Sequence, residues 1–135
     1  MNITVVGTGY VGLVTGTCFA NAGNNVTCLD IDPTKIELLN RGEVPFFEPG
    51  LSELMTRSID AGRLRFTDSV ETAYENANVI FICVGTPTDG HGKCDLSHIK
   101  SVANDISNHI HICGESPVVI IKSTVPVGFT KKIRK

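Results

Sequence analysis

The sequence contains no long apolar run and no large excess of charge of either sign. Its longest apolar stretches, residues 79–84 and 118–121, fall far short of the roughly 20 residues that a membrane-spanning helix requires. Twelve Lys and Arg residues oppose fourteen Asp and Glu residues, so no basic field is available for nucleic acid or an anionic membrane surface. We therefore expect a soluble protein with no nucleic-acid and no membrane partner, and 135 residues suffice for one domain.

Metal-ligand and disulfide patterns are missing as well. Five cysteines form an odd set without a C-x-x-C pair, and the four histidines show no ligand spacing. We predict no metal site, a reducing cytoplasmic location, and a role for Cys83 as a small core residue. The chain opens on a strand rather than a cationic leader. The motif G-x-x-x-x-G-K-S/T does not occur, which excludes a phosphate-loop NTPase.

The hydrophobic pattern alternates between short apolar runs and stretches with a 3.6-residue period, which is typical of buried parallel strands covered by helices. Five strands are predicted at residues 3–6, 26–29, 64–66, 79–84 and 118–122, and six helices at 10–22, 33–41, 51–61, 68–76, 96–111 and 129–135. The predicted fold class is α/β: a Rossmann-type doubly wound, mainly parallel sheet with helices on both faces. Because five strands leave such a sheet incomplete, we expect residues 1–135 to be the N-terminal domain of a longer protein. The buried face of the first helix is predicted to consist of Val11, Val14, Cys18 and Ala22.

A glycine-rich turn follows the first predicted strand. Gly7, Gly9 and Gly12 satisfy G-x-G-x-x-G where a strand passes into a helix, the context that a dinucleotide-binding turn requires. The first glycine permits the tight turn, the second lets a pyrophosphate approach the backbone, and the third lets the helix pack closely. The helix N-terminus adds N–H groups and a positive dipole end. The predicted diphosphate site therefore comprises Gly7, Thr8, Gly9, Tyr10, Val11 and Gly12.

An acidic residue, Asp30, follows the second predicted strand, 18 residues after Gly12. A carboxylate at this place accepts hydrogen bonds from both hydroxyls of an adenosine ribose, and no cation directly follows to take a 2′-phosphate, so NAD is favoured over NADP. Lys35, on the next helix, is either a solvated lysine or a cofactor contact. An S-adenosylmethionine-dependent methyltransferase and a nucleotide-sensing module without catalysis remain alternatives. The three-glycine spacing favours a dinucleotide, because the methyl donor carries no phosphate.

Two more strand ends carry candidate site residues. In an open parallel sheet, ligands bind outside the carboxyl ends of the strands. The segment after the fourth strand offers backbone amides and a hydroxyl, and consists of Val84, Gly85, Thr86 and Pro87. The fifth strand is followed by Lys122, Ser123 and Thr124, polar groups whose burial without partners would be costly. We predict that both segments line the same crevice as the glycine turn.

Five ordered blocks of the sequence form a more specific pattern than the glycine turn alone. They are GTGYVG at 7–12, LDID at 29–32 with Lys35, FEPGL at 47–51, VGTPT at 84–88 and KSTVPVG at 122–128. Together they resemble the N-terminal part of the UDP-glucose/GDP-mannose dehydrogenase family, over essentially the whole chain. The resemblance implies a cytoplasmic, NAD-dependent enzyme, dimeric or larger, that oxidises the C6 alcohol of a nucleotide-sugar substrate twice, as from UDP-glucose to UDP-glucuronate. GDP-mannose and UDP-N-acetylmannosamine are the alternative substrates.

The resemblance also implies roles for single residues. The glycine turn with Val11 meets the diphosphate and Asp30 meets the adenosine ribose, while Lys35 and Thr86 are further NAD contacts. Thr124 is the catalytic hydroxyl near the nicotinamide that helps to hold a water. The family's cysteine nucleophile and the residues that support it have no counterpart in this sequence. We therefore expect the chain to bind NAD without oxidising a sugar nucleotide by itself.

Overall fold

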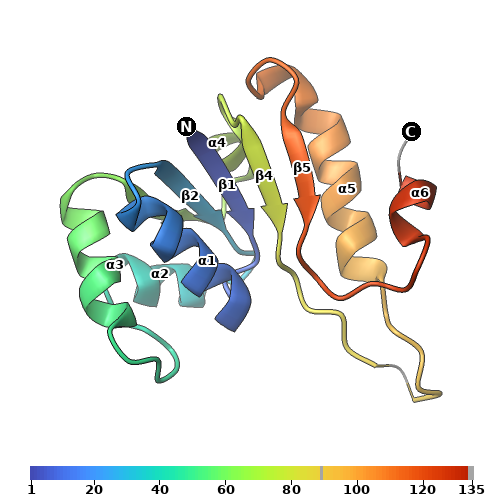
Figure 1. The fold of residues 1–135 in the computed structure, drawn as a ribbon, viewed down its shortest axis with the longest axis horizontal. Coiled ribbons are helices and arrows are strands. Elements are labelled where there is room, and N and C mark those ends of the chain that lie inside the picture. The colour runs from blue at the N-terminus through green and yellow to red at the C-terminus, as the bar shows by residue number, and fades with distance from the viewer. Residues whose placement is uncertain (89, 134–135) are drawn as a thin grey trace.

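A computed structural model describes residues 1–88 and 90–133, which fold around one parallel sheet (Figure 1). The strands are β1 (Asn2–Val6), β2 (Asn25–Leu29), β3 (Leu64–Thr67), β4 (Val79–Ile82) and β5 (Val118–Ile121). They are all parallel and lie in the order β3-β2-β1-β4-β5. The chain first winds outward from β1 to β3 and then returns to β4 on the other side of β1. The strand order therefore reverses between β1 and β4, where ligands of doubly wound sheets bind.

Helices cover both faces of this sheet, which confirms the predicted fold class. They are α1 (Tyr10–Asn21), α2 (Pro33–Asn40), α3 (Leu51–Asp60), α4 (Val70–Tyr74), α5 (Ser97–His109) and α6 (Phe129–Ile133), with a 3₁₀ turn at Ile110–Ile112. Buried residues of α1, α2 and α3 share one hydrophobic core with the sheet, and those of α4, α5 and α6 share a second core on the opposite face. The predicted last helix extends to 135, and its final two residues lie outside the described part. No helix within the described ranges is long and apolar enough to cross a membrane.

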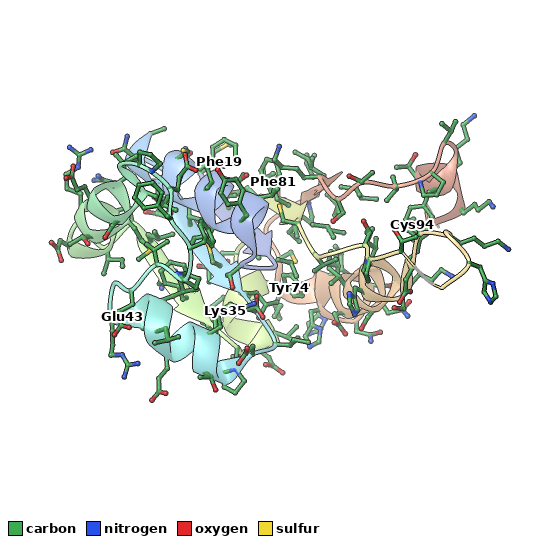
Figure 2. The ribbon with its side chains drawn as sticks, turned by 90° about the horizontal axis from the view of Figure 1, so that it is seen from below. Phe19, Lys35, Glu43, Tyr74, Phe81 and Cys94 are labelled. Carbon is green, nitrogen blue, oxygen red and sulfur yellow. The ribbon has the colours of Figure 1, made fainter. Side chains whose placement is uncertain are left out.

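The buried face of α1 differs from the predicted one. Its buried residues are Gly12, Leu13, Gly16, Thr17 and Ala20, whereas Val11, Cys18 and Ala22 are exposed and Val14 is half-buried. A Cβ at Gly16 would lie 2.7 Å from the sulfur of Cys28, so the helix lies almost directly on β2. Close approach therefore selects the small residues at positions 12, 16 and 20, four residues apart, over the larger apolar ones. At the far end of the helix, Phe19 packs on Phe81 of β4 with ring centroids 5.1 Å apart (Figure 2).

The edge strand β5 also departs from the expectation of strands buried on both faces. Val118 is 56% exposed, and Val119 and Ile120 are exposed as well. Val118 and Ile120 continue the register of Val79 and Phe81 on the face that carries α1. A strand at the sheet edge has a neighbour on one side only, and helix α1 lies over the central strands. The apolar sequence of β5 therefore predicted the strand correctly but not its burial, because the described residues leave much of this strand exposed.

Candidate cofactor site

The glycine turn between β1 and α1 has a geometry that only glycine permits at two of its positions. Gly7 has a φ of +97°, and a Cβ there would lie 2.9 Å from the carbonyl oxygen of Cys83. A Cβ on Gly12 would lie 1.8 Å from the carbonyl oxygen of Gly7, so α1 starts in direct contact with the end of β1. Gly9 differs from both, because a Cβ there would meet nothing within 4 Å. The backbone at Gly9 is therefore open to an approaching group.

Asp30 lies at the end of β2 and faces the glycine turn. Its Oδ2 accepts hydrogen bonds from the amide of Thr8 at 2.8 Å and from the hydroxyl of Thr8 at 2.6 Å. The ammonium of Lys35 lies 3.0 Å from the same oxygen, and the amide of Asp32 donates to Oδ1 at 3.1 Å. The turn and the carboxylate thus form one connected unit, although 22 residues separate them in the sequence.

Lys35 owes its place beside Asp30 to the way α2 begins. Pro33 occupies the first turn, and the carboxylate of Asp32 accepts hydrogen bonds from the amides of Thr34 and Lys35. This cap fixes the first turn of α2, with Lys35 in it, next to the carboxyl end of β2. Lys35 is therefore paired with Asp30 rather than solvated on its own, and its contact with the cofactor stays a prediction (Figure 2).

The surroundings of Asp30 determine its charge. Burial alone would raise the pKa of this carboxyl, but the hydrogen bonds from the Thr8 hydroxyl and amide, from Lys35 and from Asp32 outweigh burial and hold the pKa below its ordinary value. Asp30 is therefore an anion at neutral pH. An anionic acceptor suits ribose hydroxyls and disfavours a phosphate group.

This shift makes the contribution of Asp30 to stability depend on pH. A carboxyl whose pKa is lowered by folding stabilises the protein above its unfolded pKa of about 3.9, and the contribution disappears as pH falls through the folded value. We expect the free energy of unfolding of the wild-type chain to exceed that of an Asp30→Asn variant most clearly above pH ~5. Urea denaturation of both proteins between pH 7 and pH 3 measures the difference. A gap that widens as the pH falls would contradict the proposed hydrogen bonding of the ionised form.

The segments after β4 and β5 lie next to each other, and their place in one site with the glycine turn stays a prediction. Among the described residues, the thiol of Cys94 lies 3.8 Å from both the carbonyl oxygen of Thr86 and that of Thr124 (Figure 2). The hydroxyls of Thr86 and Thr124 have no hydrogen-bond partner within the described ranges, whereas that of Ser123 donates to the carbonyl of Val84 at 2.7 Å. The segments after β4 and β5 thus carry two hydroxyls without a partner among the described residues.

The structure corrects the expectation for Lys122 and confirms the one for Cys83. Lys122 is exposed, so the argument that its ammonium would be buried without a partner is wrong. Its ammonium lies close enough to Cys83 to oppose the effect of burial on the pKa of that thiol. Cys83 is buried, and burial raises the pKa of its thiol to about 11, which confirms it as a small core residue.

Sequence reasoning did not predict a contact between the glycine turn and the loop at 43–50. The phenol of Tyr10 donates a hydrogen bond to the carboxylate of Glu48, and its ring lies 5.0 Å from that of Phe46. This hydrogen bond is the main cause that raises the pKa of Tyr10. Spacing gave no signal for the contact, because residues 10 and 48 meet only through the fold. The resemblance to a family had singled out the block that contains Glu48, without a role for it.

The arrangement defines a class of protein. A glycine turn open at Gly9, an anionic acceptor at the end of β2, and two hydroxyls at the ends of β4 and β5 surround the strand-order reversal of a parallel sheet. Such an arrangement is typical of a Rossmann-type dinucleotide-binding domain. Within the described residues, no group of three or more His, Cys, Asp or Glu side chains is placed to hold a metal ion.

The chain belongs to the UDP-glucose/GDP-mannose dehydrogenase family and matches its NAD binding domain over residues 1–135. It is 45% identical over 136 residues to the UDP-glucose 6-dehydrogenase of Rhizobium meliloti (strain 1021), with 100% of this chain and 30% of the relative covered. A crystal structure of a ternary complex of GDP-mannose dehydrogenase from Pseudomonas aeruginosa is 37% identical with a TM-score of 0.92, covering 98% of this chain and 30% of the other.

A second solved structure, a UDP-glucose dehydrogenase from the archaeon Pyrobaculum islandicum, is also 37% identical with a TM-score of 0.92. The match covers 98% of this chain and 31% of the archaeal chain. The chain thus spans about 30% of the length of the relatives that it matches. The family membership identifies the cofactor of this domain as NAD.

Proposed function

We propose that the chain is the NAD-binding domain, residues 1–135, of a nucleotide-sugar dehydrogenase that oxidises UDP-glucose to UDP-glucuronate with reduction of two NAD. The observation that carries the proposal is the Asp30 carboxylate, held by Thr8 beside a turn that is open at Gly9. This combination suits an adenosine ribose joined to a diphosphate. The names of the relatives at 45–49% identity support the sugar nucleotide.

The proposed contacts rest on which groups the ends of the strands bring together. The N–H groups at the start of α1 face the diphosphate across the open backbone at Gly9, and Asp30 accepts the ribose hydroxyls while Lys35 keeps the carboxylate oriented. Thr86 and Thr124 offer their hydroxyls to the nicotinamide half, with Thr124 as the catalytic hydroxyl. The full proposed set of site residues is Gly7, Thr8, Gly9, Tyr10, Val11, Gly12, Asp30, Lys35, Val84, Gly85, Thr86, Pro87, Ser123 and Thr124. Ser123 belongs to the set by position and does not donate to NAD, because its hydroxyl donates to Val84.

Bound NAD supplies the acceptor for the hydride that leaves C6 of the sugar. The chain contributes binding and orientation to this reaction. Its buried thiols, Cys28 and Cys83, have raised pKa values and serve the core, so neither is an activated nucleophile. Because the family's cysteine nucleophile has no counterpart in this sequence, we assign the covalent chemistry of the whole protein to parts beyond this domain.

Titration calorimetry of the 135-residue chain tests the proposal. NAD should bind more tightly than NADP, and S-adenosylmethionine should give no heat of binding. The chain alone should form no NADH from UDP-glucose, whereas the longer protein should form two NADH for each UDP-glucose consumed. Tighter binding of S-adenosylmethionine than of NAD would favour a methyltransferase instead.

We also propose that the whole protein acts in the cytoplasm as a homodimer or larger assembly. The five cysteines carry no disulfide in the structure, which suits a reducing compartment. The exposed apolar residues of β5 suit contact with further protein. Light scattering of the longer protein measures its mass, and a monomer would contradict this assembly.

A further inference from the structure

Ser123 lies where β4 and β5 separate. The last ladder hydrogen bond between these strands runs from the amide of Lys122 to the carbonyl oxygen of Ile82 at 2.9 Å. The amide of Ser123 shares the same acceptor at 3.1 Å. Its hydroxyl lies 3.2 Å from that carbonyl oxygen as well, and closer, at 2.7 Å, to the carbonyl oxygen of Val84 past the end of the ladder. Both hydrogens of Ser123 thus bind backbone carbonyls of the β4 segment, and neither is available to a ligand.

A second contact joins the same two segments. The sulfur of Cys94 lies within hydrogen-bonding distance of the carbonyls of Thr86 and Thr124, as described above. A thiol has one weakly donated hydrogen, so it cannot hold both carbonyls firmly. The Ser123 hydroxyl, half-buried and at a short distance, is the stronger of the two connections.

We propose that Ser123 is a positioning residue, whose hydroxyl holds the segment after β5 against the segment after β4 and thereby sets Thr124 relative to Thr86. The inference rests on the proposed function, in which these two threonines meet the nicotinamide half of NAD. The adenosine diphosphate half depends on different elements, namely the turn after β1 and Asp30 after β2. Loss of the Ser123 hydroxyl should therefore loosen one half of the site and leave the other intact.

Two ligands separate these halves. ADP occupies the part of the site at Gly9 and Asp30 only, whereas NAD also requires the part at Thr86 and Thr124. In calorimetry of the full 135-residue chain, Ser123→Ala should lower the affinity for NAD by about threefold to tenfold, the usual effect of one lost hydrogen bond. The affinity for ADP should change by less than about twofold. The fluorescence of bound NADH, which reports the surroundings of the nicotinamide, should shift toward that of free NADH.

Matched variants complete the experiment. Ser123→Thr keeps the hydroxyl and should restore the NAD-to-ADP affinity ratio, and Ser107→Ala removes an exposed serine of α5 and should change nothing. If Ser123→Ala does not stay folded at 25 °C, Ser123→Cys, which keeps the size but donates weakly, takes its place. A thermal melt of each variant records its stability.

The outcomes are distinct. A parallel loss of NAD and ADP binding, or no loss of either, overturns the positioning role of Ser123 and leaves the proposed function in place. A wild-type chain that binds neither NAD nor ADP overturns the proposed function, and this inference falls with it. A selective loss of NAD with an altered NADH spectrum, reversed by Ser123→Thr, supports the inference.

Discussion

Replacing Asp30 by asparagine is expected to reverse the nucleotide preference of the chain from NAD to NADP. The wild-type carboxylate is an anion that accepts hydrogen bonds from Thr8, and it would repel a 2′-phosphate on the ribose. Asparagine keeps the shape and one acceptor oxygen but removes the charge. Hydrogen bonds to charged groups contribute about 1.5–3 kcal/mol, so NAD should bind roughly 10-fold to 100-fold more weakly.

NADP should gain affinity in the same variant, because Lys35 changes its partner. Its ammonium lies 3.0 Å from Oδ2 of Asp30 in the wild type and forms an ion pair with that carboxylate. With an uncharged residue at position 30, the ammonium faces the site unpaired and suits a phosphate group. We expect NADP to bind at least about 10-fold more tightly to the variant than to the wild type.

Calorimetric titration of both chains with NAD and with NADP measures the change. Asp60→Asn, which removes an exposed carboxylate at the end of α3, is the matched control and should leave both affinities unchanged. A double variant, Asp30→Asn with Lys35→Met, should lose the gained NADP affinity. If Asp30→Asn weakens NAD and NADP by the same factor, the carboxylate does not set the choice between them.

The parts of the site that could be predicted from the sequence are those in which each residue's role follows from its own place along the chain. Gly7 and Gly12 are required by a turn that spans six residues, and the structure shows positive φ at the first and a backbone carbonyl against the second. Asp30 follows a strand that pairs directly with β1, so its backbone lies beside the turn, and the hydrogen bonds from Thr8 show that its carboxylate faces the turn. Fold class and most element boundaries followed from hydrophobic period for the same local reason.

The parts that could not be predicted depend on contacts between distant segments. The buried face of α1 is set by how closely the helix approaches Cys28. The hydrophobic period of the sequence shows which residues are apolar, but it does not show the distance between the helix and the sheet. Ser123 was predicted as a ligand contact because it follows a strand end, yet its hydroxyl donates to the carbonyl oxygen of Val84, 39 residues away. Likewise, Tyr10 meets Glu48 only once the loop at 43–50 has folded over the first turn of α1. Position at a strand end therefore predicts that a residue is near the site, but not whether its side chain faces the ligand.

The second and third glycines of the turn, Gly9 and Gly12, should separate the effects of substitution on NAD binding from those on folding. Gly9 has a φ of −68°, which any residue adopts, and the space beyond its missing Cβ is open. Gly9→Val should therefore fold and melt like the wild type, while its side chain occupies the place that the diphosphate needs. We expect no measurable NAD binding by this variant, a loss of at least about 100-fold.

Gly12→Ala should behave in the opposite way. Its Cβ would lie 1.8 Å from the carbonyl oxygen of Gly7, which is backbone and has no free rotation to yield. The start of α1 must then move away from β1, and the free energy of unfolding should fall by about 3 kcal/mol or more. Urea denaturation and NAD titration of both variants, with Gly23→Asn as a control at the left-handed end of α1, make the comparison. A Gly9→Val chain that still binds NAD as tightly as the wild type would place the diphosphate elsewhere, because a valine side chain and a pyrophosphate cannot share the space over that backbone.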